Sequence, residues 1–143
     1  MERKDFIKTC GFACLGGALF SSILEGCSSS KIVAGIIDHD NLVVPASVFG
    51  QDKSSFKKYV VVQHPQLKYP VCVYRFSEAE YTALLMRCTH QGAELQVFGD
   101  RLECPAHGSQ FSNKGQVKNG PANTNLRTFP VIIQNDQILI SLK

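Results

Sequence analysis

The sequence predicts an all-β fold, an antiparallel sandwich or barrel built from many short strands. Short runs of β-branched and aromatic residues recur along the chain, separated by turn-forming residues, and no segment keeps a helical period. The run 71–76 alternates regularly, so that Cys72 and Tyr74 share one face of the expected strand. The 143 residues, 44% hydrophobic and 19% charged, are enough for one globular domain with a short appendage.

The predicted strands follow one another closely from residue 31 onward. The first spans residues 31–38 and leads into a turn at Asp38-His39-Asp40-Asn41. A strand over 42–49 comes next, and Pro45 within it indicates the edge of a sheet. The remaining strands expected before the first cysteine motif are 59–63, 71–76 and 81–87.

Residues 1–30 differ from the rest and predict a signal peptide or lipoprotein anchor followed by a polar linker. Positive charges at Arg3, Lys4 and Lys8 precede an apolar run without charge, residues 9–24, which is the layout of a secretory signal. The run has about 16 residues, whereas a transmembrane helix needs about 20. The alternatives for this run are a helical membrane anchor and a buried core helix.

Two patterns inside this segment resemble bacterial export motifs. Residues 3–8 are similar to the twin-arginine motif, with Lys4 where the second arginine stands. Residues 24–27, followed by three serines, resemble a lipobox, in which the cysteine is lipidated and becomes the new N-terminus. The resemblance implies lipidation at Cys27, with a folded domain over residues 31–143.

Composition and cysteine placement argue against a nucleic-acid-binding protein and against a small domain held together by disulfides. The net charge of +3 is small and no basic stripe carries interleaved aromatics, so nucleic acid is not an expected partner. Of the six cysteines, Cys10 and Cys14 lie in the apolar run and Cys72 stands alone in a strand. This distribution is not a disulfide framework.

Two short motifs in the C-terminal half combine a thiol with an imidazole. They are Cys88-Thr89-His90 and Cys104-Pro105-Ala106-His107, and residues 93–103 between them are short enough for one hairpin with its turn at Gly99-Asp100. Thiolate and imidazole bind zinc, copper and iron–sulfur clusters. Zinc fingers tend to pair like ligands along the chain, whereas each loop here carries one of each kind. A Rieske [2Fe–2S] centre, with two Cys on one iron and two His on the other, fits this spacing, and a structural zinc site is the alternative.

The sequence around these motifs resembles the Rieske family. CTHQG at residues 88–92 and CPAHGSQF at residues 104–111 are similar to its two cluster-binding boxes, and NGPANTNLRTFPV at residues 119–131 resembles its proline loop and the next strand. The resemblance implies a Rieske-type antiparallel β-sandwich with a small cluster-binding subdomain, about residues 87–122. It also implies one [2Fe–2S] cluster per chain. The implied ligands are Cys88 and Cys104 on one iron and His90 and His107 on the other.

Further residues follow from the same resemblance. Gly92 and Gly108 turn the backbone sharply toward the cluster, Ser109 donates its hydroxyl to a bridging sulfide, and Pro121 lies in the covering loop. Phe111 stands where high-potential members usually carry Tyr, which implies a potential below the top of the family range. Respiratory Rieske subunits also carry a disulfide between the boxes, and this chain has Ala93 and Ala106 at those positions. Easier opening of the loops and loss of the cluster are therefore expected.

The implied function is one-electron transfer without an independent catalytic site. The chain is expected to be a membrane-tethered subunit of a respiratory, quinol–cytochrome c reductase-like complex on the exported (periplasmic) side of a bacterial cell membrane. A quinol-oxidising cytochrome b-like subunit would donate electrons, and a cytochrome or enzyme would accept them. The alternatives are a small subunit or ferredoxin-like carrier for an exported oxidoreductase, such as a molybdenum enzyme, and a structural zinc-binding module. His39 and His64 stand in turn-like settings away from these motifs and are expected at the surface.

Overall fold

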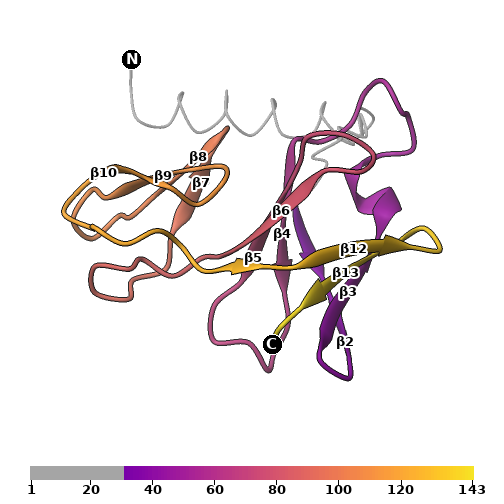
Figure 1. Ribbon diagram of the computed structural model, residues 1–143, viewed down its shortest axis with the longest axis horizontal. Helices are drawn as coiled ribbons and strands as arrows, with labels where there is room; N and C mark the ends of the chain where they lie inside the picture. The colour runs from indigo at the N-terminus through magenta and orange to yellow at the C-terminus, as the bar shows by residue number, and fades with distance from the viewer. Residues whose placement is uncertain (1–30) are drawn as a thin grey trace, which may run out of the picture.

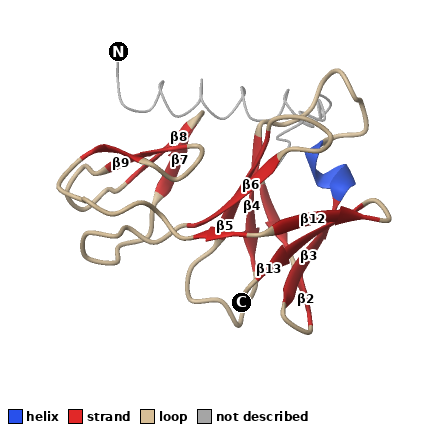
Figure 2. Cartoon of the chain, in the orientation of Figure 1, coloured by secondary structure: helices blue, strands red, loops and turns tan. Residues whose placement is uncertain are grey.

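The computed structural model describes residues 31–143, and these fold into thirteen short strands and one turn of 3₁₀ helix (Figures 1 and 2). The predicted all-β class is therefore confirmed. The signal or anchor segment, with Cys27, lies outside the described residues. Within residues 31–143, no helix has the length and hydropathy needed to cross a membrane. The elements are β1 (Ile32–Ala34), β2 (Ile36–Asp38), β3 (Asn41–Pro45), η1 (Ala46–Phe49), β4 (Tyr59–Gln63), β5 (Val71–Arg75), β6 (Tyr81–Leu85), β7 (Gln96–Phe98), β8 (Arg101–Glu103), β9 (Gln110–Ser112), β10 (Val117–Asn119), β11 (Thr128–Phe129), β12 (Val131–Gln134) and β13 (Gln137–Ser141).

The strands form three sheets. The five-stranded central sheet has the order β1-β4-β5-β6-β11, the back sheet the order β12-β13-β3-β2, and the small sheet the order β10-β9-β8-β7. Figure 1 shows the small sheet at one end of the molecule, apart from the other two. All described pairings are antiparallel except that of β1 with β4, which is parallel.

The central sheet is buried on both faces, so the molecule has two apolar cores. On β5, Val71 and Val73 pack with the back sheet, in a core that includes Ile138. Cys72 and Tyr74 point the other way, into the core beneath the small sheet. The alternation predicted for this strand is confirmed, and both of its faces exclude water, which stabilises the whole sheet by removing apolar surface from solvent.

The first predicted strand is wrong as a single element, because the chain changes sheets in its middle. It forms β1 on the central sheet and β2 on the back sheet, and Gly35 lies between them. A Cβ atom at Gly35 would stand 2.6 Å from Leu42 Cδ1 and 2.7 Å from Val62 Cγ1. The side chains of two neighbouring strands therefore fill the space beside the crossing, and a glycine there avoids the clash.

The second predicted strand is shorter than expected and lies inside its sheet. β3 ends at Pro45, and Ala46–Phe49 continues as the 3₁₀ turn with Phe49 buried. β3 lies between β13 and β2, so the predicted edge position is wrong for the strand as a whole. The pairing with β2 ends at Val43, however, so Pro45 is tolerated where no neighbouring strand needs its missing N–H.

Candidate metal centre

The hairpin predicted between the two cysteine motifs is confirmed. β7 and β8 pair with Val97 opposite Leu102 and Phe98 opposite Arg101, and Gly99 turns with a φ of 63°. Because the hairpin folds the chain back on itself, the loop before it and the loop after it reach the same end of the molecule. We call residues 88–93 box 1 and residues 104–109 box 2.

The two boxes are closed by equivalent sets of backbone hydrogen bonds. The Gly92 N–H donates to the Cys88 carbonyl over 2.9 Å, and the Gly108 N–H donates to the Cys104 carbonyl over 3.0 Å. Each cysteine N–H donates to the carbonyl five residues later, over 2.8 Å in both boxes. The glycines have φ values of 81° and 80°, a conformation that other residues rarely adopt. Their predicted role as sharp turns therefore agrees with the backbone.

The thiols of the boxes lie inside and the imidazoles outside. Cys88 is 1% exposed and Cys104 is 3% exposed, and their side chains hydrogen-bond to each other. His90 and His107 are exposed, and their rings meet edge to face with centroids 5.0 Å apart. The four side chains thus form an inner sulfur pair and an outer nitrogen pair.

The surroundings of Cys104 favour its charged form. Burial raises the pKa of this thiol, but hydrogen bonds from the Ala106 backbone, the Cys88 side chain and the His107 backbone lower it, and the net pKa lies below its ordinary value. The thiolate, and not the thiol, is the form that binds metals.

A third loop, residues 120–127, joins the two boxes. The Thr89 hydroxyl of box 1 donates to the Thr124 carbonyl over 2.6 Å. The Ala122 N–H donates to Ser109 Oγ of box 2 over 3.0 Å. Ser109 is fully buried, and as an acceptor here it keeps its own hydroxyl proton for another partner. Pro121 lies in this loop and is exposed.

The donor set fits a two-iron cluster. In a Rieske centre one iron binds two sulfur ligands and the other binds two imidazoles, and the inner and outer pairs provide these sets. Within residues 31–143, no group of three or more His, Cys, Asp and Glu side chains is placed closely enough to hold a single metal ion, so the assignment rests on the kinds of ligand and their two separate pairs.

Sequence reasoning missed two side chains that hold box 1. One is Thr89. The other is Tyr69, whose hydroxyl donates to the Gly92 carbonyl over 2.7 Å. Both bonds join segments far apart in the sequence, so no local pattern identifies them. The two histidines outside the motifs differ, because His39 is exposed whereas His64 is half-buried and its Nδ1 accepts from the Gln66 N–H.

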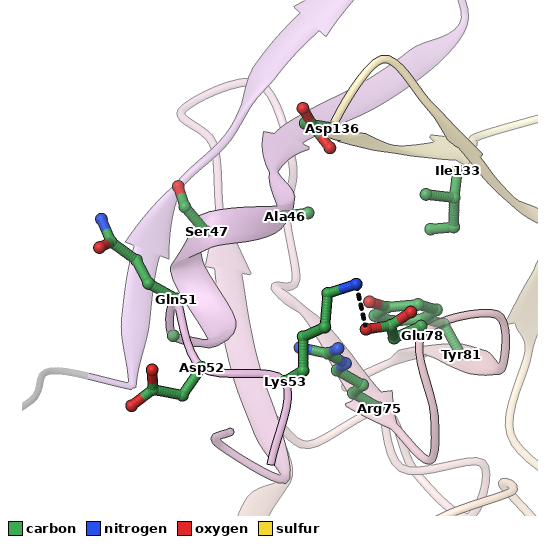
Figure 3. Close-up of a pocket in the computed structure, with 11 residues that line it drawn as sticks. Ala46, Ser47, Gln51, Asp52, Lys53, Arg75, Glu78, Tyr81, Ile133 and Asp136 are labelled. Carbon is green, nitrogen blue, oxygen red and sulfur yellow. Dashed lines mark ion pairs between the residues drawn. The ribbon is translucent and has the colours of Figure 1, made fainter. Parts of the chain in front are cut away.

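A hollow of the described part lies away from the boxes. It measures about 520 Å³ and is lined by η1, the loop after it, the facing ends of β5 and β6, and the turn between β12 and β13, with no residue from either box (Figure 3). Lys53 and Glu78 form an ion pair across it at 3.5 Å. We assign it no part in the metal chemistry.

An all-β domain with a buried thiol pair beneath an exposed imidazole pair defines a class of iron–sulfur electron carriers. The model of the Rieske [2Fe-2S] domain family matches residues 42–130. The chain belongs to this family and carries a Rieske-type [2Fe–2S] cluster.

Curated relatives come from two groups. The cytochrome b6-f complex iron-sulfur subunit of Prochlorococcus marinus (strain NATL1A) is 39% identical over 56 residues, which cover 38% of this chain and 32% of that protein. The oxygenase component of dicamba O-demethylase from Stenotrophomonas maltophilia is 33% identical over 81 residues, 50% of this chain and 24% of that protein. The matched part therefore spans about a third or less of these relatives' length.

Solved structures give the same fold. The cyanobacterial plasma membrane Rieske protein PetC3 from Synechocystis PCC 6803 matches with a TM-score of 0.52 and 28% identity, over 59% of this chain and 87% of that one. A chain of the oxygenase–ferredoxin complex of carbazole 1,9a-dioxygenase matches with a TM-score of 0.55 and 24% identity, over 74% of this chain and 96% of that one. At that identity the second match bears on the fold alone.

Proposed function

We propose that Cys88 and Cys104 hold one iron of the cluster and that His90 and His107 hold the other. The observation that carries this assignment is the separation of buried thiols from exposed imidazoles at one end of the domain. The cluster supplies one-electron redox chemistry when bound. The chain's own residues bury the sulfur side, turn the backbone at two glycines and leave the imidazoles open to a partner.

The proposed role is that of a membrane-tethered carrier in a quinol-oxidising complex. The b6-f relatives and the plasma membrane Rieske protein support a membrane setting, and the lipobox-like residues before Ser28 supply a tether through Cys27. Electrons would come from a cytochrome b-like subunit and pass to a cytochrome or enzyme on the periplasmic side. The exposed imidazoles are the proposed contact point for both.

The ligand assignment is tested by His107→Cys in the full chain, compared with His39→Gln as a control at an exposed histidine. Replacing an imidazole by a thiolate adds negative charge at the iron, so the reduction potential of the variant should fall. Potentiometric titration followed by electron paramagnetic resonance measures it. A His107→Cys protein with the wild-type potential and spectrum would contradict the assignment.

The tether is tested separately by labelling with a palmitate analogue. Wild-type protein should take up the label and fractionate with membranes, whereas Cys27→Ser should do neither. Label that persists in Cys27→Ser would refute lipidation at this residue.

The second candidate is a carrier for an exported oxidoreductase. Ala93 and Ala106 favour it, because the disulfide of respiratory Rieske subunits is missing between the boxes. The partner that co-purifies with the full chain from membranes distinguishes the two roles, a b-type cytochrome for the first and a catalytic subunit for the second.

A further inference from the structure

Tyr69 approaches box 1 from a different part of the chain. It lies in the loop between β4 and β5, is half-buried, and its hydroxyl donates to the Gly92 carbonyl over 2.7 Å. The next residue fixes its place, because the Pro70 carbonyl accepts a 3.0 Å hydrogen bond from Met86, two residues before Cys88. The hydroxyl is therefore delivered to box 1 by a loop that is itself fastened to the start of the box.

The hydrogen bond from Tyr69 breaks the symmetry of the boxes. Gly92 and Gly108 make equivalent backbone hydrogen bonds. Of their two carbonyls, however, only that of Gly92 accepts a side-chain hydrogen bond within residues 31–143. The same peptide unit carries the Ala93 N–H, which has no acceptor in the described part of the chain. One end of this peptide is thus held, and its donor end is left available in the box that contains Cys88.

We propose that Tyr69 is a positioning residue that raises the reduction potential of the cluster through the Gly92–Ala93 peptide. This proposal rests on the ligand assignment above. A hydrogen bond accepted by a carbonyl polarises its peptide and strengthens the N–H as a donor. A stronger donor to the cluster sulfurs stabilises the reduced, more negative state. Phe111 is buried beside the boxes but has no hydroxyl with which to raise the potential. Tyr69 provides a hydroxyl from a neighbouring loop instead.

The first test compares Tyr69→Phe with Tyr59→Phe in the cluster-loaded full chain. Tyr59 is also half-buried, but its hydroxyl accepts a hydrogen bond from Lys31 Nζ at 3.4 Å and, within residues 31–143, makes no hydrogen bond to either box. Tyr69→Phe should lower the reduction potential and speed iron release to a chelator roughly two- to tenfold, the range of one hydrogen bond. Tyr59→Phe should match the wild type in both. Faster release without a change of potential would overturn the tuning role.

The second test remains informative if Tyr69→Phe does not hold its cluster. Replacing all four tyrosines of the wild type by 3-fluorotyrosine makes their hydroxyls stronger donors, and the potential should rise. The same replacement in Tyr69→Phe, where it loads, should leave the potential unchanged. An unshifted potential in the fluorinated wild type overturns the proposal. A Rieske spectrum in the unsubstituted wild type shows that this failure does not come from the ligand assignment.

Discussion

Ser109 shows how one buried hydroxyl can join two loops of a metal site. Its Oγ accepts the Ala122 N–H over 3.0 Å, and both residues are almost fully buried. Ser109→Ala would leave that N–H without a partner, which costs about 1–3 kcal/mol of unfolding free energy. Chemical denaturation of the cluster-loaded protein measures the loss. Ser54→Ala, at an exposed serine, is the matched control and should stay within about 0.5 kcal/mol. Equal stability of the two variants would rule out the link.

A second residue-scale effect concerns pH. Burial raises the pKa of the Cys72 thiol far above its ordinary 9.0, with a smaller opposing effect of its hydrogen bond to Tyr74. Burial also raises the pKa of Tyr74 above its ordinary 10.0, and the neighbouring Cys72 adds to this. Above pH 9 the unfolded chain releases the thiol proton while the folded chain keeps it, so the stability is complete below that pH and falls as the pH rises.

Cys72→Ala should therefore lose less stability than the wild type between pH 8 and pH 10, roughly the range around the unfolded thiol pKa. Urea unfolding of the apo protein at each pH gives the two slopes. Only the pH-dependent difference is compared, because the substitution also removes buried volume. Parallel slopes would contradict the assignment of the alkaline loss to Cys72.

At the scale of elements, Gly35 sets the distance between the central and back sheets. Gly35→Ala would drive its Cβ into Leu42 and Val62, and this overpacking should cost about 1–3 kcal/mol. Val62→Ala removes one of the clashing groups, so the double variant should lose less stability than the sum of the single changes. Denaturant unfolding of all four proteins completes the cycle. Strict additivity would contradict a clash between the added methyl group and Val62.

The elements that periodicity describes were predictable, and those set by contacts between sheets were not. β4 matches the predicted residues 59–63, because its apolar run is bounded by turn residues. The break at Gly35 was missed because the crowding comes from Leu42 and Val62. The same holds for the site. Residues of the motifs carry their own chemistry and stand out, whereas Tyr69 acts across a distance in sequence that no spacing reveals.

For the whole molecule, the cluster-bearing end and the two-core body should respond differently to removal of iron. The boxes are loops, whereas one face of the central sheet packs against the back sheet in an apolar core that contains none of the four proposed ligands. Chelation should raise amide hydrogen exchange in residues 88–93 and 104–109 and leave β4 and β5 protected. Hydrogen exchange with mass spectrometry separates these regions. Loss of protection throughout the central sheet would mean that the cluster holds the entire fold together.

The place of β1 has a mechanical consequence. A tether pulling at residue 31 loads β1 first, because this strand lies at the edge of the central sheet and hydrogen-bonds to β4. The small sheet shares no hydrogen-bond ladder with β1. Tension would therefore separate this edge strand from β4 before it strained the β7–β8 hairpin between the two boxes. In the proposed tethered state, the first strand would take up the tension, and the end of the domain that carries the boxes would keep its geometry while it meets a partner.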